Sequence, residues 1–128
     1  MSTTIVLADD CPDLRAVYSP LLRSAGYDVL EASNGREAVD LVRVHQPSLL
    51  ILDLWMPFLN GFEVLETLRD EGASNQLKVL MLSNHSDAQY QLFAFKNGAI
   101  EFLVKNLTSL SELLASVERV LGGDSVSA

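Results

Sequence analysis

Three carboxylates and a lysine stand directly after short apolar runs of the 128-residue sequence. Asp9 and Asp10 follow the first run, Asp53 follows four apolar residues, and Lys105 follows a run nearer the end of the chain. If the three acids meet, they repel one another and destabilise the fold unless a cation lies among them. Carboxylate oxygens with room for water suit Mg²⁺, and Mn²⁺ is a second candidate. The pattern therefore predicts a divalent-cation site.

A simpler interpretation of Asp9 and Asp10 is helix capping, because acids are stabilised by the free N–H groups at the start of a helix. Capping does not account for Asp53, which follows the apolar residues 49–52, where an uncompensated charge is costly. We therefore favour a functional site over a capping role.

Ser83 and Lys105 follow apolar runs in the same way, after residues 79–82 and 102–104. Beside Asp53, the lysine could neutralise the carboxylate and then hold an anion bound to it, and the Ser83 hydroxyl could donate to the same anion. Either residue alone could be a solvated loop side chain. Suitable groups at the ends of four apolar runs together indicate one site.

The apolar runs at residues 5–8, 49–52, 79–82 and 102–104 are too short for helices and are typical of buried strands. A fifth run, 27–32, contains Asp28 and Glu31, and Glu101 precedes the run at 102–104. We expect these two more polar strands at the edges of a sheet.

Segments with helical periodicity separate the strands. The first helix is predicted to start at Pro12 and end near Gly26, and the last to start at a Ser109–Glu112 capping box and end at Gly122 and Gly123. Three more helices are expected near residues 35–44, 62–71 and 87–97.

Alternating strands and helices predict an α/β fold with parallel strands and helices on both faces of the sheet. With the two polar strands at the edges, the strand order is 2-1-3-4-5. This is a flavodoxin-like (βα)5 three-layer sandwich, in which ligands bind beyond the carboxyl ends of the strands.

The acidic composition narrows the partners. Seventeen acidic and nine basic residues give a net charge of −8, which repels nucleic-acid phosphates and anionic lipids, so we expect no direct nucleic-acid partner. No apolar run approaches the roughly 18 residues that span a bilayer, and we expect no membrane insertion. The lone Cys11 permits no internal disulfide, which favours a cytoplasmic protein. We predict one folded domain over residues 1–123 and a flexible tail over 124–128.

Several short motifs resemble those of response-regulator receiver domains of two-component signalling, such as the chemotaxis regulators. They are Ala8-Asp9-Asp10, Asp53 with Met56-Pro57 and Asn60-Gly61, Ser83, Gly98-Ala99 and Lys105. The resemblance spans nearly the whole chain, and the motifs occur in the order of the family.

By this resemblance, Asp53 is the phosphoacceptor, and the donor is a phosphohistidine of a sensor histidine kinase or phosphotransfer protein. Asp10, Asp53 and the backbone carbonyl of Trp55 would ligate Mg²⁺, and Asp9 would act through water. Lys105 and Ser83 would hold the remaining phosphoryl oxygens, and Ser83 would move to do so. Catalysis is then limited to self-phosphorylation and self-dephosphorylation of the chain.

The resemblance also implies a switch. Phe102 occupies the family's aromatic switch position and would reshape the surface of the fourth helix, fifth strand and fifth helix for a downstream protein effector. An ordinary alternating strand residue is the other interpretation of Phe102. Tyr90 and Phe93, on the other face of the helix from Leu92 and Phe95, could add apolar area for a weak homodimer, with a monomer as the alternative.

Two features depart from the family. Asn106 follows Lys105, where the family has a proline in a cis bond; without proline that bond costs roughly 3 kcal/mol, so cis and trans both stay open. Trp55 and His85 lie two residues beyond Asp53 and Ser83, at positions whose side chains border the path of a hydrolytic water in this family. Trp55 would screen an acyl phosphate, whereas His85 would orient water or donate to the phosphoryl group, or be a surface histidine.

Three other functions are alternatives to a phosphorylation-dependent signalling switch. A metal-dependent phosphatase would use Asp53 as nucleophile, but no added acid or cap domain is evident, and turnover would decide. A flavin carrier would need a glycine-rich phosphate loop, which residues 9–12 lack. A receiver that binds partners without phosphorylation is disfavoured because all five site groups are present. We expect no fused output domain and therefore output through a protein contact. A segment of a longer regulator, with residues 122–128 as the start of a linker, is the alternative.

Overall fold

The computed structural model describes residues 3–72, 76–85 and 87–126 of the chain. Its single sheet is parallel and contains the five strands β1 (Thr4–Ala8), β2 (Asp28–Ala32), β3 (Leu49–Leu52), β4 (Lys78–Ser83) and β5 (Ala99–Val104). The strand order is β2-β1-β3-β4-β5. This confirms the predicted winding and places the two more polar strands at the edges.

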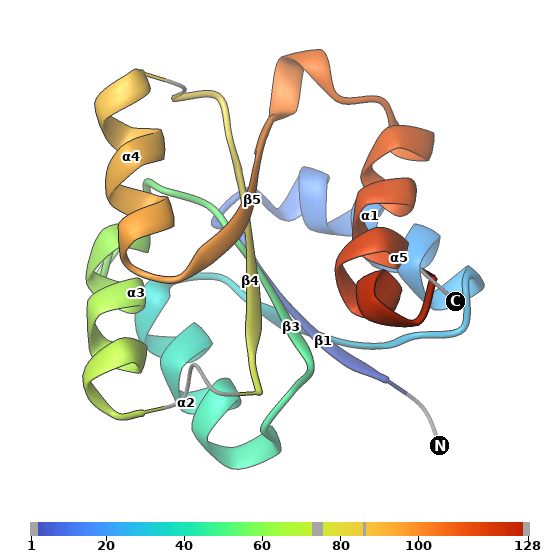
Figure 1. The fold of residues 1–128 in the computed structure, drawn as a ribbon. Helices are drawn as coiled ribbons and strands as arrows, with labels where there is room; N and C mark the ends of the chain where they lie inside the picture. The colour runs from blue at the N-terminus through green and yellow to red at the C-terminus, as the bar shows by residue number, and fades with distance from the viewer. Residues whose placement is uncertain (1–2, 73–75, 86, 127–128) are drawn as a thin grey trace.

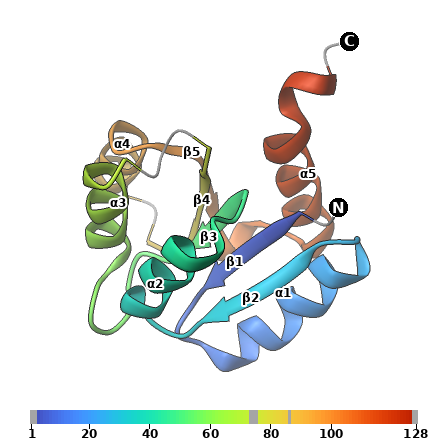
Figure 2. The same cartoon turned by 90° about the horizontal axis from the view of Figure 1, so that it is seen from below.

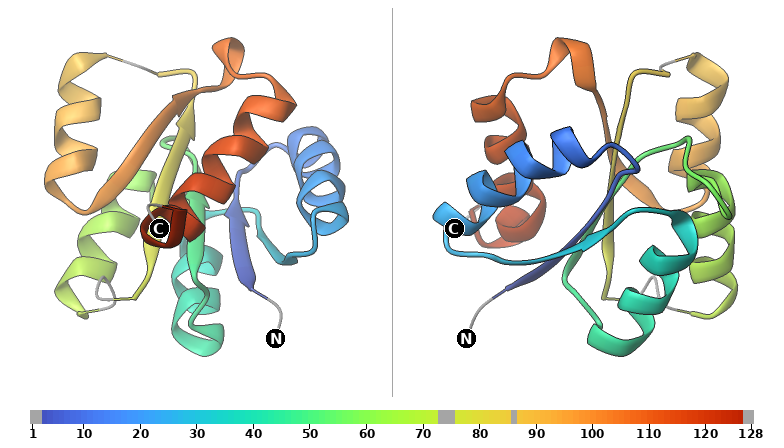
Figure 3. Two further views of the ribbon diagram at one scale, coloured as in Figure 1. Left: turned by 45° about the vertical axis from the view of Figure 1, so that its right-hand side comes forward. Right: turned by 180° about the vertical axis from the view of Figure 1, so that it is seen from behind.

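Helices cover both faces of the sheet (Figure 1). They are α1 (Pro12–Ser24), α2 (Gly35–His45), α3 (Gly61–Asp70), α4 (Ala88–Lys96) and α5 (Leu110–Val126), with a short 3₁₀ turn at Lys105–Leu107. Figures 2 and 3 show α1 and α5 on one face and α2, α3 and α4 on the other, which confirms the three-layer sandwich. Within the described ranges, no helix is long and apolar enough to cross a bilayer.

Alternate residues of each strand enter two separate cores. In β1, Ile5 and Leu7 pack on the side of α1 and α5, whereas Val6 and Ala8 pack on the side of α2 and α3. Because the central strands are buried on both faces, their sequence reads as an unbroken apolar run. Asp9 and Asp53, which directly follow the runs of β1 and β3, therefore lie at the ends of these strands.

Reciprocal side-chain bonds start two of the helices. Asn60 accepts from the Glu63 N–H while Glu63 accepts from the Asn60 N–H, each at 2.9 Å. Ser109 and Glu112 form the same capping box at the start of α5, as predicted. The box at Asn60 fixes the start of α3 at Gly61, eight residues after Asp53.

The predicted end of the last helix at Gly122 and Gly123 is wrong, because α5 continues to Val126. A glycine costs only about 1 kcal/mol in a helix and ends one mainly by adopting a positive φ. Among the described residues, the glycines with positive φ are Gly26, Gly72 and Gly98. The first three residues of the predicted tail are thus helical, and 127–128 lie outside the described residues.

Gly61 is expected to tolerate no side chain. Its N–H donates to the Leu54 carbonyl at 2.7 Å, and an added Cβ would lie 2.5 Å from the Asp53 carbonyl oxygen. We expect Gly61→Ala to lower the free energy of unfolding by about 2 kcal/mol, because the backbone after Asp53 must shift. Urea unfolding checks this, with Glu66→Ala on the exposed side of α3 as a control. Equal stability of Gly61→Ala and wild type would contradict the expectation.

Candidate functional site

Four polar side chains meet at the carboxyl edge of the sheet, where the connection from β5 to α5 leaves at the top of Figure 1. Asp9 follows β1, Asp53 follows β3, Ser83 ends β4, and Lys105 follows β5. Parallel strands place their carboxyl ends at one edge, so residues up to 96 positions apart in the sequence become neighbours.

The structure brings the lysine and the predicted acids together. The Lys105 Nζ lies 2.8 Å from Asp9 Oδ2 and 3.2 Å from Asp53 Oδ2. One carboxylate oxygen from each of Asp9, Asp10 and Asp53 lies within 4.8 Å of the others. Asp9 is 2% exposed and Asp53 7%, whereas Asp10 is exposed. The cluster therefore opens to solvent on the side of Asp10.

The two buried acids are also held by the backbone. Asp9 Oδ1 accepts from the Cys11 N–H at 2.9 Å, and Asp53 Oδ1 accepts from the Leu54 N–H at 2.8 Å. The second oxygen of each carboxylate faces Lys105. Asp10, in contrast, makes no hydrogen bond or ion pair with any described residue. Its carboxylate is the least constrained of the three.

The electrostatics leave this cluster short of positive charge. Burial raises the pKa of the Asp53 carboxyl, and the Asp9 charge adds to the rise against the opposing effect of Lys105. Burial would lower the pKa of Lys105, but its hydrogen bond to Asp9 and the charges of Asp53 and Asp9 outweigh this effect and raise it. Lys105 contacts two of the three carboxylates, and no other basic side chain among the described residues forms an ion pair with them, so two negative charges remain uncompensated when all three are ionised.

The donor set fits a hard divalent cation. Mg²⁺ prefers one or two carboxylates and keeps several waters, and the exposed, unpartnered Asp10 beside the buried Asp53 offers both carboxylate oxygens and access for water. Two excess negative charges match the charge of the ion. The residues present can therefore hold Mg²⁺, as the sequence predicted, and Mn²⁺ by the same chemistry.

Lys105 reaches the acids without a cis bond. No peptide among the described residues is cis, so the Lys105–Asn106 bond, left open by the sequence, is trans. The Asn106 N–H donates to the Asn84 side chain at 2.8 Å, which ties this turn to the loop after β4. Sequence reasoning missed Asn84, whose acceptor role is visible only when the two loops are adjacent.

Ser83 is the last residue of β4, and Phe102 lies within β5. The Ser83 side chain is buried, and its Oγ accepts from the His85 N–H at 3.1 Å. Phe102 pairs with Met81 across the β4–β5 register and packs, half-buried, against the core on the α2–α4 side. A conformational role of either residue stays a prediction.

An aromatic cluster borders the site and was not predicted. Trp55 is 40% exposed and makes edge contacts, at centroid distances of 5.7, 5.9 and 6.1 Å, with His85, Tyr90 and Phe62. Phe93 packs on Phe62 at 4.7 Å. The cluster joins the loop after β3 to the loop after β4 and to α4.

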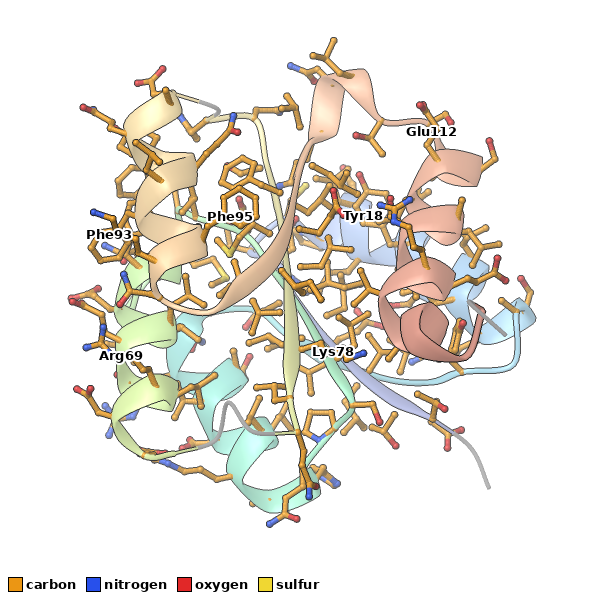
Figure 4. The ribbon with its side chains drawn as sticks, in the orientation of Figure 1. Tyr18, Arg69, Lys78, Phe93, Phe95 and Glu112 are labelled. Carbon is orange, nitrogen blue, oxygen red and sulfur yellow. The ribbon has the colours of Figure 1, made fainter. Side chains whose placement is uncertain are left out.

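This packing corrects the suggestion that Tyr90 and Phe93 enlarge an exposed apolar surface. Both rings are partly buried against Phe62. The exposed apolar residues of α4 are instead Leu92 and Phe95, and Figure 4 shows Phe95 and Phe93 on different sides of the helix. The short α4 carries apolar residues around most of its circumference, so periodicity could not tell which side packs.

A family model described as a response regulator receiver domain matches residues 5–118. The nitrate/nitrite response regulator protein NarL of Escherichia coli is 35% identical over 125 residues, which are 96% of this chain and 56% of NarL. The DNA-binding regulator RpaA of Synechocystis is 35% identical over 117 residues, 91% of this chain and 48% of RpaA. The chain thus spans about half the length of these curated relatives.

Solved structures agree with these relatives. The chemotaxis protein CheY4 of Vibrio cholerae superposes with a TM-score of 0.87 at 29% identity, covering 94% of this chain and all of CheY4. A LuxR-family DNA-binding response regulator from Staphylococcus aureus gives 0.85 at 27% identity, covering 93% of this chain and 98% of that one.

Replacing Asp53 with asparagine is expected to stabilise the metal-free fold. The raised pKa of Asp53 means that ionisation of its carboxyl destabilises the folded state relative to the unfolded one. This loss of stability is present at neutral pH, where the carboxyl is ionised. It disappears as the pH falls through the folded-state pKa toward the unfolded-state value of 3.8. We expect Asp53→Asn to unfold at a higher temperature than wild type near neutral pH in divalent-free buffer, with a difference that shrinks on acidification. Circular dichroism melts measure both.

The exposed Asp28→Asn carries the same charge change on β2 and is the control. We expect it to shift the melting temperature little. A lower melting temperature for Asp53→Asn would mean that its contact with Lys105 outweighs burial.

Proposed function

The chain belongs to the response regulator receiver family of two-component signalling, and from that premise we propose that Asp53 accepts a phosphoryl group from a phosphohistidine. The observation that carries the proposal is the Lys105 ammonium in contact with both Asp9 and Asp53, with the Asp10 carboxylate directed at the same point. Phosphoryl transfer depends chiefly on such alignment and charge neutralisation.

Asp53 is the nucleophile. Its Oδ1 accepts from the Leu54 N–H, and its Oδ2, which contacts the movable Lys105 side chain, is the oxygen that attacks phosphorus. The Oδ2–phosphorus bond forms as the phosphorus–nitrogen bond to the donor imidazole breaks, and the imidazole leaves with a proton from solvent. Asp10, Asp53 and the Trp55 carbonyl, with Asp9 through water, would hold Mg²⁺, and the bound ion would supply positive charge for the phosphoryl oxygens. Lys105, which contacts Asp53 before transfer, then donates to one of the phosphoryl oxygens.

Ser83 satisfies a further oxygen of the phosphoryl group. Its hydroxyl accepts from the His85 N–H, so its own proton is free to donate. Movement of Ser83 toward Asp53 draws the loop after β4 with it, and Phe102 follows by turning inward. This movement changes the α4–β5–α5 surface for a protein effector.

We propose a sensor histidine kinase or a phosphotransfer protein as donor, in the cytoplasm, and no turnover of a separate substrate. The names of the relatives include DNA-binding regulators. The net charge of −8 argues that this segment itself acts through protein contacts rather than by touching nucleic acid.

Incubation with Mg²⁺ and a small acyl phosphate tests the proposal by intact-protein mass. We expect one added phosphoryl group on wild type and none on Asp53→Asn. Lys105→Met should slow the reaction about 100-fold, because one donor to the developing charge is lost, whereas Lys96→Met, an exposed lysine of α4, should react at the wild-type rate. Unmodified wild type, or modification that persists in Asp53→Asn, would refute the proposal.

Trp55 is expected to slow hydrolysis of the acyl phosphate. Its ring, braced by His85, Tyr90 and Phe62, stands beside the site and restricts the approach of water. We expect Trp55→Ala to lose the phosphoryl group severalfold faster, and Trp55→Phe to be intermediate. Decay of the phosphorylated mass over time measures this.

Phe58→Ala removes a more exposed aromatic ring from the same loop and is the control. Its decay should match wild type. If Trp55→Ala decays no faster than Phe58→Ala, the screening role is wrong.

A further inference from the structure

Arg15 lies beside the acidic cluster without contacting its carboxylates. Its side chain extends from α1 and is only 16% exposed. The Nη1 donates to the main-chain carbonyl of Asp9 at 2.5 Å, and the Nε donates to Glu31 of β2 at 3.2 Å. The guanidinium therefore joins α1 and the edge strand to the loop that carries Asp9 and Asp10.

These contacts fix the peptide between Asp9 and Asp10. The Asp9 N–H donates to the Ala32 carbonyl at 3.1 Å, and the Asp9 carbonyl accepts from Arg15, so the backbone is held on both sides of this residue. The Asp10 side chain has no partner among the described residues. Its direction is consequently set by the backbone from which it leaves.

We propose that Arg15 is a positioning residue for the divalent cation, an inference that depends on the proposed function. By holding the Asp9–Asp10 peptide, it keeps the Asp10 carboxylate within 4.8 Å of the Asp9 and Asp53 oxygens, against their mutual repulsion. Residues that orient metal ligands typically contribute to metal affinity without touching the ion.

Glu31 supports the orientation of Arg15. It accepts from the Arg15 Nε, and its other oxygen lies 3.7 Å from Arg23. The forked guanidinium is required because its Nε and Nη1 serve two acceptors at once, which a lysine ammonium on a flexible stem does less well. Arg23 also contacts Glu31 but donates to the Val29 carbonyl, away from the acids.

A positioning role of Arg15 and a purely electrostatic role predict opposite changes in Mg²⁺ affinity when Arg15 is removed. Removing a cation near an acidic site strengthens Mg²⁺ binding if only charge matters, because the remaining field is more negative. Removing a residue that aims Asp10 weakens it. The direction of the change therefore separates the two effects.

Isothermal titration with MgCl₂ on the full chain tests the proposal. We expect Arg15→Met to weaken Mg²⁺ binding about 10-fold, Arg15→Lys to recover part of the loss, and Arg23→Met, with the same change in net charge, to stay within about twofold of wild type. The Mg²⁺ concentration that half-saturates phosphorylation should rise with the dissociation constant, while the rate at saturating Mg²⁺ changes little. A general structural defect would lower that rate as well.

Unchanged or tighter Mg²⁺ binding by Arg15→Met would overturn the positioning role and leave the proposed function intact. Wild type that binds no Mg²⁺ would refute the proposed function itself. Should Arg15→Met fail to fold, Glu31→Gln replaces it. We expect a two- to threefold loss of Mg²⁺ affinity relative to Asp28→Asn, which makes the same charge change on β2, because the ion pair that orients the Arg15 guanidinium is lost. Wild-type affinity in Glu31→Gln would then overturn the proposal.

Discussion

The contact of Lys105 with both Asp9 and Asp53 is the interaction on which the site depends. The fold places two nearly buried carboxylates at the ends of adjacent strands, β1 and β3, where their repulsion opposes folding. Lys105 reaches them from β5, two strands beyond β3, and only a long side chain can bridge that separation. Because one lysine cannot neutralise three acids, the same arrangement that permits folding leaves affinity for a further cation.

Close backbone packing restricts the loop that follows Asp53 and so holds the carboxylate in place. A Cβ on Gly35 would meet the Leu59 carbonyl, and one on Gly61 would meet the Asp53 carbonyl, so the starts of α2 and α3 both pack against the segment 53–59. The Asn60–Glu63 capping box then holds the start of α3. The sequence motif Asn60-Gly61 is thus explained by geometry: one residue caps the helix, and the next has no space for a side chain.

Strand-end chemistry was predictable from sequence because parallel strands impose it. Four apolar runs are each followed by a polar residue: Asp9, Asp53, Ser83 and Lys105. In a parallel sheet these residues must lie at the same edge. The runs are easy to identify in the sequence because the strands are buried on both faces. Contacts to the main chain were not predictable. Arg15 on the Asp9 carbonyl and Asn84 on the Asn106 N–H leave no pattern in residue spacing. The continuation of α5 past Gly122 also escaped, because glycine disfavours a helix without forbidding it.

The aromatic cluster offers a physical link between the acceptor and α4. Ser83 accepts from the His85 N–H, and the His85 ring packs edge-on against Trp55, which in turn contacts Tyr90 of α4. A shift of Ser83 toward Asp53 must either break its bond with His85 or carry that ring along Trp55. In both cases the packing at the start of α4 changes, because close-packed rings admit few alternative arrangements. Trp55 would therefore restrict water at the acceptor and also connect the two loops, two roles that follow from one side chain standing between them.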